Sequence, residues 1–334
     1  MTGSVRLFAL CSLSPVPLLA LASWSGGVWA VAAFAYIAGV TALLDRLIAH
    51  ATRNGHPDTE FPAADPLSVL LALSHFALMA LALAAIAGHT GLSGWERLLI
   101  FLAHGLFFGQ VSNANAHELI HRANPWLRRL GTWVYISLLF GHHASAHPKV
   151  HHRYVASELD PNSARKGESF YHFLPRAWWG SFRAGLRQET LDLKRGGRGW
   201  MRHPYLVYLA GSLAFLVLAQ LTGTTLAWLA LSAHATVQLL LSDYVQHYGL
   251  QRRRLENGRL EPVSSAHSWN TPHYFTSHMM LNAPRHSDHH AHPARPYPQL
   301  QLPADAPLLP RSLPVMATLA LFPRRWRKVM DGRL

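Results

Sequence analysis

Residues 67–88 read LSVLLALSHFALMALALAAIAG, and this block decides the fold class. It contains no charged residue, and its length suits a helix that crosses a bilayer core of about 30 Å, which needs roughly 20 apolar residues. Blocks of the same character lie at about 5–24, 26–48, 97–116, 205–222 and 225–246. The sequence therefore predicts an all-α integral membrane protein with about six transmembrane helices.

The composition agrees with this prediction. Half of the 334 residues are hydrophobic and only 14% are charged, and the apolar residues lie in long blocks. The first block has some features of a signal peptide, but a very short link joins it to the second block, which favours a retained helical hairpin. With no internal repeat, the chain is predicted to be a single integral-membrane domain over 1–334. The shorter apolar run 133–140 is predicted to be a re-entrant or interfacial helix.

The distribution of Lys and Arg predicts the orientation. The links at 25–27, 88–94 and 222–224 contain neither residue, whereas the other segments are rich in both. The positive-inside rule then places both termini and the segments 49–66, 117–204 and 247–334 on the cytoplasmic side, as in a multi-pass protein of a bacterial inner membrane.

The chain is strongly basic, with 30 Lys and Arg against 17 Asp and Glu, and a net charge of +13. A membrane explains this excess better than nucleic acid does, so no nucleic-acid partner is expected. Basic runs such as Arg252 to Arg254, and Arg324, Arg325, Arg327 and Lys328, would lie near anionic headgroups or attract an acidic electron-transfer partner. Both roles can hold together.

Nine histidines form four short clusters, each at or beyond a predicted helix end on the cytoplasmic side. They are His117 and His121; His147, His151 and His152; His247; and His286, His289 and His290. The spacings i, i+4 and i, i+3 direct the rings of a cluster to one side of a helix. The sequence therefore predicts a histidine-lined metal pocket.

The chemistry of imidazole limits what this pocket holds. Neutral imidazole suits iron, zinc, copper and nickel, and nine ligands exceed the coordination number of one ion, so two metal ions are implied. The single cysteine, Cys11, excludes thiolate zinc sites, iron–sulfur clusters and disulfides. In HELIHR the second histidine comes one residue too late for the H-E-x-x-H zinc-protease motif.

Four sequence blocks together carry a family resemblance. They are HELIHR at 117–122, HPKVHHRYVASELDPNSARKGESFY at 147–171, SDYVQHYGLQR at 242–252 and LNAPRHSDHHAHP at 281–293. In this order, the blocks resemble those of the membrane-bound alkane 1-monooxygenases, which belong with xylene monooxygenase to the integral-membrane histidine-rich hydroxylase and desaturase superfamily.

The resemblance implies a fold like that of fatty acid desaturases, with the nine histidines as ligands of two non-haem irons. It also implies an enzyme that uses O2 and two electrons to hydroxylate an unactivated terminal or benzylic carbon of a hydrophobic substrate, such as an alkane, an alkyl chain or an alkylbenzene. A rubredoxin or ferredoxin with its reductase would supply the electrons, since the sequence has no flavin or nicotinamide fingerprint.

The chain departs from the family at two positions. Ala146 and Gln246 stand where the alkane enzymes usually carry Glu, directly before a ligand. A carboxylate that accepts the remote ring N–H of a ligand orients it and raises its basicity. Four other carboxylates are candidates for this role: Glu118, Asp160, Asp243 and Asp288.

Six further histidines are assigned to the background. His142, His143 and His292 adjoin the clusters, and His75, His104 and His234 lie within apolar helices, where a buried polar ring pairs with another helix.

Two other functions stay open from the sequence. A membrane desaturase or lipid hydroxylase would share the histidine clusters but accept an acyl chain with a polar head. A metal transporter or sensor would place ligands near the bilayer midplane, whereas these clusters lie at one face.

Overall fold

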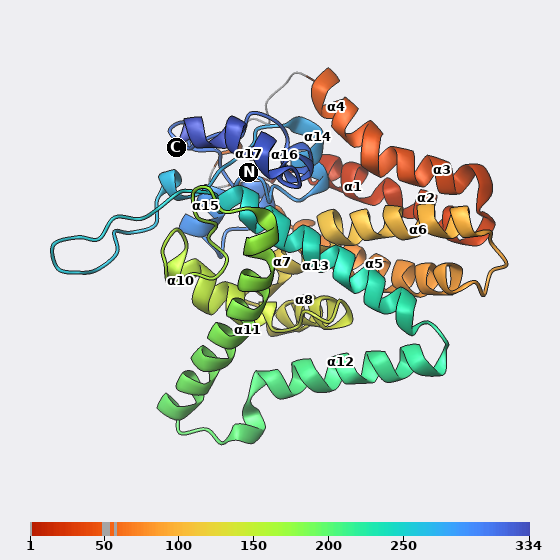
Figure 1. Ribbon diagram of the computed structural model, residues 1–334, viewed down its shortest axis with the longest axis horizontal. Helices are drawn as coiled ribbons and strands as arrows, with labels where there is room; N and C mark the ends of the chain where they lie inside the picture. Colours follow the sequence, from red (N-terminus) through yellow and green to blue (C-terminus); the bar gives the residue numbers. More distant parts are fainter. Residues whose placement is uncertain (1, 49–53, 57–58) are drawn as a thin grey trace.

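The computed structural model describes residues 2–48, 54–56 and 59–334 (Figure 1). Parts of the predicted cytoplasmic link 49–66, namely 49–53 and 57–58, lie outside the described residues. Within the described ranges the chain is helical, and β-pairing is confined to isolated bridges. The prediction of an all-α protein is confirmed.

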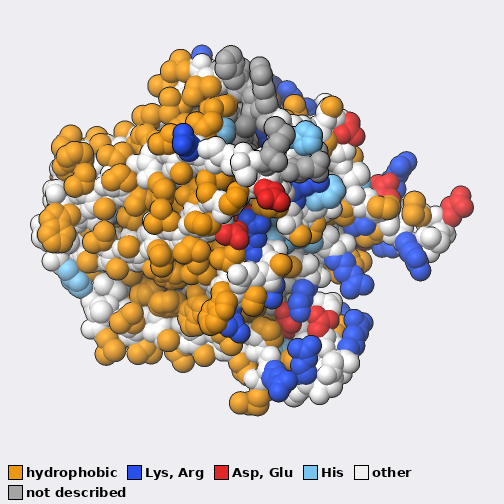
Figure 2. All heavy atoms as spheres, turned by 180° about the vertical axis from the view of Figure 1, so that it is seen from behind, with side chains coloured by type: hydrophobic (Ala, Val, Ile, Leu, Met, Phe, Trp, Pro, Cys, Tyr) orange, Lys and Arg blue, Asp and Glu red, His pale blue; other side chains and the backbone are white. Residues whose placement is uncertain are grey.

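Five helical runs of the described chain are long and apolar enough to cross a membrane. They are α1 (Arg6–Leu13) with α2 (Pro15–Ser25); α3 (Gly27–Ala35) with η1 (Tyr36–Val40) and α4 (Thr41–Leu47); α5 (Ala64–Ala87); α12 (Pro204–Leu221); and α13 (Thr225–His247). Each matches a predicted span to within a few residues. Figure 2 shows apolar side chains over one half of the molecule and Lys and Arg gathered at the other end.

The predicted span 97–116 is not among these five. It lies in a continuous helical run made of α6 (Gly94–Phe107), the π-helical η2 (Phe108–Ser112) and α7 (Asn113–Ile120). Its second half is too polar, because it carries Gln110, Asn113 and Asn115. These side chains bond to neighbouring helices: Asn113 donates to the Ala235 carbonyl of α13 at 3.0 Å, and Asn115 to the Ser68 carbonyl of α5 at 2.8 Å.

The predicted short helix 133–140 proves to be longer and to start earlier. α8 runs over Pro125–Ser137 and is capped by Asn124, whose side chain accepts the N–H of Trp126 at 2.9 Å. It packs against α7 through Gly131, where a Cβ would lie 2.8 Å from the Ala116 carbonyl. The Trp228 indole of α13 donates to the Ser137 carbonyl at 2.7 Å. α8 is therefore fastened to the helices that carry the histidines.

One long helix has no counterpart among the predicted elements. α11 (Phe170–Arg195) is amphipathic, buries Ala177, Ser181 and Gly185, and lies across the direction of the spans (Figure 1). Charged residues such as Arg183, Arg187 and Lys194 interrupt its apolar residues, so a search for apolar blocks does not find it. It packs against α9 (His143–Ala146) and η3 (His147–His151), which α10 (His152–Tyr154) follows. After α11 the chain forms turns and the short η4 (Trp200–Arg202) before α12 begins.

The C-terminal part covers the charged end of the molecule with short helices. They are η5 (Ser265–His267), α14 (Tyr274–Met279), α15 (His286–Ala291), η6 (Tyr297–Gln299), α16 (Leu313–Ala320), α17 (Pro323–Met330) and η7 (Asp331–Arg333). Much of 251–285 is irregular, and its first part projects from the body as a hairpin closed by the Arg254–Leu260 bridge (Figure 1).

Candidate metal centre

The nine histidines come from four helical segments that meet at the charged end of the spans. α7 carries His117 and is followed by His121; η3 and α10 carry His147, His151 and His152; α13 ends at His247; and α15 carries His286, His289 and His290. Figure 1 shows α7, α10, α13 and α15 converging there, on the side where both termini lie.

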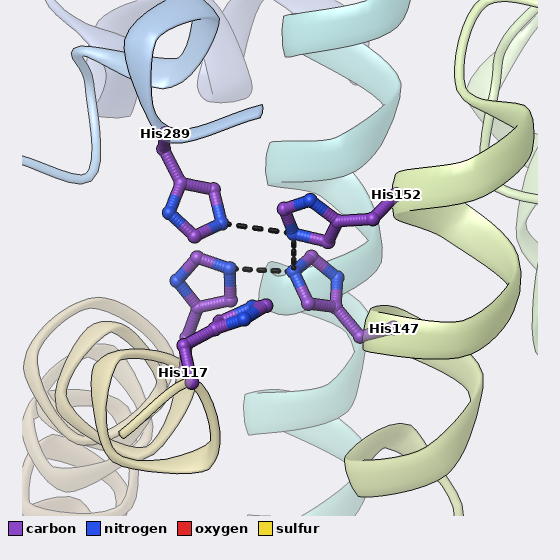
Figure 3. A group of neighbouring side chains, drawn as sticks. His117, His147, His152 and His289 are labelled. Atoms are coloured by element: carbon purple, nitrogen blue, oxygen red, sulfur yellow. Dashed lines mark hydrogen bonds between the residues drawn. The ribbon is translucent and has the colours of Figure 1, made fainter. Parts of the chain in front are cut away.

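Five of these residues form one set, which we call the five-His group: His117, His121, His147, His152 and His289. One ring nitrogen from each lies within 4.8 Å of all the others. Figure 3 shows the rings turned toward one another. The Nε2 atom of His147 lies 2.6 Å from that of His117 and 3.0 Å from that of His152, and the His152 and His289 Nε2 atoms are 3.0 Å apart.

The other four residues form the four-His group: His151, His247, His286 and His290. All four are buried, and their nitrogens meet the same 4.8 Å limit. The Nε2 atom of His286 lies 3.0 Å from that of His247 and 3.1 Å from that of His290. The nine predicted site residues therefore divide between two neighbouring groups.

The division does not follow the sequence clusters. His147 and His152 contribute to the five-His group while His151 contributes to the other, and α15 likewise sends His289 one way and His286 and His290 the other. The expectation that each cluster points its rings one way is therefore wrong for these two. Adjacent residues on a helix are about 100° apart, so His151 and His152 cannot face the same point.

The protonation of the rings fits a bound cation. Burial, and then the neighbouring rings, lower the pKa of His147, His152, His289 and His290 well below its ordinary value, so these imidazoles are neutral. Two facing Nε2 atoms cannot both donate a proton to each other. In the described chain the Nε2 atoms of His121 and His151 are buried with no hydrogen-bond partner. A metal ion in each group would satisfy these converging lone pairs.

One carboxylate contacts a ring of the nine. The Nδ1 atom of His151 lies 2.8 Å from Asp160, which also accepts the Ser163 hydroxyl at 2.7 Å. Burial alone would lower the pKa of His151, but the Asp160 carboxylate raises it above its ordinary value. Since a carboxylate accepts, Asp160 holds a proton on Nδ1, and in the neutral ring, the form that binds a metal, the Nε2 lone pair points into the four-His group. The His267 carbonyl, 3.4 Å from His247 Nδ1, has a similar position.

The other three carboxylate candidates bond elsewhere. Glu118 pairs with Arg122 at 3.0 Å and accepts the N–H of Tyr297, which ties the C-terminal segment to α7. Asp288 pairs with Arg295 at 2.6 Å and with His292 at 2.9 Å. Asp243 accepts the Asn162 amide at 2.7 Å, behind Asp160. The structure thus corrects the expectation that these three orient ligand rings.

Most of the background histidines lie apart from both groups, and His143 is the exception. His75 bonds Ser137 at 2.9 Å, His104 bonds Ser23 at 3.3 Å, and His142 bonds Ser181 at 3.3 Å, each joining two helices. His234 faces Gly105, where a Cβ would collide with its ring. His143 lies next to His147, with ring centres 4.9 Å apart.

The two positions that depart from the family have different surroundings. Gln246 accepts the Ser242 hydroxyl at 2.9 Å and donates to the Ala283 carbonyl at 3.2 Å, so it joins α13 to the segment before α15. Ala146 lies under Gly185 of α11, where an added Cβ would be 3.1 Å from the Ala146 Cβ.

Sequence reasoning missed a polar network that holds the η3 turn. Lys149 lies between His147 and His151 in the sequence. Its ammonium group donates to Glu189 at 2.7 Å and to Asp192 at 2.8 Å, both on α11. Glu189 also accepts the hydroxyl of Ser145 at 2.6 Å. No local motif marks these residues, because their partners lie about 40 residues apart in sequence.

A small cavity lies between the two groups. It measures about 50 Å³ and is lined by His117 and His147 of one group and His286 of the other, with Gln110, Asn113 and Tyr135 beside them. A groove of about 420 Å³ between α13, α16 and the η1–α4 helix adjoins it. The residues that line both spaces are Gly109, Gln110, Ser242 and Met280. In the sequence, the polar Gln110 and Asn113 within an otherwise apolar helix were the pattern that could have indicated this cavity.

The spans, the histidine groups and the helical architecture define an integral-membrane histidine-rich metalloprotein. The family model described as fatty acid desaturase matches residues 93–319. Alkane 1-monooxygenase 1 of Pseudomonas aeruginosa is 32% identical over 92% of this chain and 83% of its own length. Alkane 1-monooxygenase 2 of Alcanivorax borkumensis is 30% identical over 96% of this chain and 88% of its own.

A more distant relative is the hydroxylase component of xylene/toluene monooxygenase from Pseudomonas putida, which is 28% identical over 63% of this chain and 57% of its own length. The chain belongs to the alkane 1-monooxygenase family, within the wider family of fatty acid desaturases. It is an O2-dependent membrane hydroxylase with a histidine-rich site that can bind metal.

Proposed function

We propose that the nine histidines hold two non-haem iron ions and that the enzyme hydroxylates a terminal or benzylic C–H bond of a hydrophobic substrate. The observation that carries this proposal is the convergence of nine imidazole nitrogens, from buried or partly buried residues, in two adjacent groups. Iron in an imidazole site is redox-active, unlike zinc, and can supply the electrons that O2 activation needs. The reaction consumes O2, two electrons and two protons, and it yields an alcohol and water.

The substrate is an alkane, an alkyl chain or an alkylbenzene. The groove beside the cavity supports this choice, because it is lined mostly by apolar residues, including Ile37 and Leu241 of two candidate spans and Leu313 of α16. An oily molecule dissolved in the bilayer enters there and reaches the cavity between the groups past Gln110 and Met280. These two residues would position the carbon that reacts.

We further propose a multi-pass arrangement in a bacterial inner membrane, with both termini in the cytoplasm and the chain forming one domain. Figure 1 supports this arrangement, since both ends lie at the end that holds the histidines. Lys and Arg gather at that end (Figure 2), as the positive-inside rule requires. A rubredoxin or ferredoxin, reduced by its reductase, would deliver electrons there.

Whole-cell conversion tests the reaction. Cells that express the chain with a rubredoxin and its reductase are given octane, a long alkane and p-xylene, and the products are separated by gas chromatography. A terminal or benzylic alcohol that disappears in the His286→Ala variant is the expected result. An alkene from a fatty acyl substrate, without any alcohol from these three, would overturn the proposal in favour of a desaturase.

A further inference from the structure

The C-terminal helix α17 presents a row of cations to solvent. Arg324, Arg325, Arg327 and Lys328 are all exposed, while Trp326 and Met330 on the opposite face are buried. In the described chain none of the four forms an ion pair; Arg327 donates only to the Gly167 carbonyl, at 3.3 Å. The cations stand beside the exposed ring of Phe322, over which the Arg325 guanidinium lies. This surface, which we call the α17 face, combines uncompensated charge with an apolar side chain.

Beneath the α17 face, aromatic rings lead inward. Trp326 is fully buried, and its ring centre lies 5.2 Å from that of Tyr248 and 5.4 Å from that of Tyr244. Tyr248 directly follows His247, whose Nε2 atom faces His286 in the four-His group. One indole and one phenol ring therefore separate the surface helix from a residue of the site.

Tyr248 is held firmly between these partners. Its hydroxyl donates to Asp331 at 2.7 Å and accepts the N–H of Gly167 at 2.9 Å. Its carbonyl accepts the Trp269 indole N–H at 2.9 Å. Asp331 follows α17 directly, so the same contact also anchors the end of that helix. The surface helix and the last residue of α13 are thus coupled through one fixed ring.

The other basic run of the sequence is different. Arg252 donates to the Glu261 and Arg153 carbonyls, Arg253 pairs with the Glu261 carboxylate at 3.2 Å, and Arg254 bonds within the hairpin. These guanidinium groups hold the projecting hairpin together. Of the two basic runs, α17 is the one that leaves its charges free and that packs against a residue next to a site histidine.

We propose that the α17 face docks an acidic one-electron carrier protein and that Trp326 and Tyr248 form the entry route for its electrons toward His247. Charge complementarity selects the partner, and the small apolar contribution suits a weak, transient redox contact. Each docking event would oxidise the carrier by one electron and pass that electron to the metal that the histidines would hold, and two events would supply the two electrons of a turnover. The inference rests on the proposed function for its redox role.

Anionic lipid is the competing source of negative charge. The aromatic contacts favour the protein carrier, because the rate of electron transfer falls steeply with distance and is higher through tightly packed rings. Binding of a lipid headgroup involves no electron transfer and does not require such rings. Lipid binding by the α17 face is therefore an outcome that the test must separate.

Binding to the metal-free protein tests the docking step alone. Oxidised rubredoxin is titrated at low salt into the detergent-solubilised chain, the Arg324→Glu/Arg325→Glu variant and a matched control, Arg183→Glu/Arg187→Glu, which reverses two exposed cations on α11. We expect the α17 variant to bind about tenfold more weakly and to lose most of the salt dependence, and the control to bind like the parent. Equal binding by all three proteins would overturn the proposal.

Vesicles that contain phosphatidylglycerol provide the lipid comparison. If the α17 variant lost affinity for these vesicles and kept its affinity for rubredoxin, the face would be a lipid site and the proposal would be wrong. Because both experiments use metal-free protein, they can fail while the parent enzyme still makes alcohol, and they can succeed if it makes none. Failure here is thus distinct from failure of the proposed function.

The route is tested by anaerobic reduction of iron-loaded protein with saturating reduced rubredoxin, followed by stopped-flow absorbance. Trp326→Phe keeps a ring and should keep the rate within a few-fold, whereas Trp326→Leu should slow reduction by about an order of magnitude at unchanged rubredoxin affinity. Equal rates in both variants would exclude the ring as a route. If the leucine variant fails to fold, Tyr248→Phe and Tyr248→Leu give the same comparison one ring further inward.

Discussion

The two histidine groups are held in different ways. All residues of the four-His group are buried, whereas three of the five-His group are partly exposed. In the four-His group, Asp160 and the His267 carbonyl fix the ring nitrogens of His151 and His247 that face away from the group. In the five-His group, the Nδ1 atoms of His147 and His152 are buried without a hydrogen-bond partner in the described chain. Polar partners thus fix two rings of the four-His group, whereas its other two, His286 and His290, have buried Nδ1 atoms without a hydrogen-bond partner in the described chain, like His147 and His152.

One short segment, η3 with α10, carries histidines of both groups. The π-helical η3 turn and α10 supply ligands to both groups, so the position of that turn fixes the distance between them. The four-His group is the more buried of the two, and the five-His group has one more histidine and a less enclosed setting. We expect the two groups to respond differently to mutation and to chelators.

The largest expected effect is loss of a ligand from the four-His group. His286→Ala leaves three imidazoles and should remove the metal of that group and abolish hydroxylation, whereas His121→Ala leaves four in its group and should retain measurable activity. Iron per chain and alcohol formation are measured side by side. Equal loss in both variants would mean that the groups are equivalent in strength.

Asp160→Asn tests whether the carboxylate beside His151 supports the four-His group, and it removes no ligand. The amide keeps the shape but loses the charge that orients His151, and we expect iron affinity of the four-His group to fall by about 10- to 100-fold. Titration with iron under anaerobic conditions measures the change. Asp288→Asn is the matched control, because Asp288 bonds Arg295 and His292 instead of a site ring. A similar loss of affinity in the control would remove Asp160 from this role.

Partial metal removal should distinguish the groups by their exposure. On timed incubation of loaded protein with a chelator, we expect the five-His group to release its iron first, since its rings are less enclosed. Repeating the incubation with His121→Ala then shows which group still holds iron. Because His121 belongs to the five-His group, this variant should speed only the early phase of iron release. Simultaneous release of both ions would show that burial does not set the rate.

The smallest expected effect comes from the clamp that serves both groups. Lys149→Met breaks the contacts to Glu189 and Asp192 and leaves the largely buried Glu189 with one partner fewer. The free energy of unfolding should fall by about 1–3 kcal/mol. Denaturation in detergent measures this loss, and iron affinity should weaken at both groups alike. If iron affinity changed at one group only, the Lys149 contacts would support that group alone, and the account of a shared turn would be wrong.

The sequence is sufficient to predict the apolar spans and the nine clustered histidines, because both patterns are local in the chain. Long apolar blocks follow from the bilayer's thickness, and helical spacing brings residues such as His117 and His121 to one side. The way the ligands divide is not local. It depends on the π-helical turn at His147–His151 and on how α15 enters the centre, and packing between distant segments decides both.

The misses have the same physical origin. Hydropathy does not detect α11 because charged residues interrupt its apolar ones. The contacts of Lys149 and Ser145 form only when α11 packs on η3, so the sequence does not show them. Glu118 and Asp288 looked like carboxylates for ligand rings, yet each was nearer to an arginine in the folded chain. The polar half of the predicted span 97–116 bonds to groups on other helices, which a local hydropathy pattern cannot show.

The measurement that tests the central claim most directly is metal analysis of the purified protein, combined with X-ray absorption at the iron edge. The account predicts two irons per chain, each surrounded by imidazole nitrogen, and loss of one iron in His286→Ala. A single iron, or zinc in either group, would contradict the claim that the nine histidines form a two-iron centre.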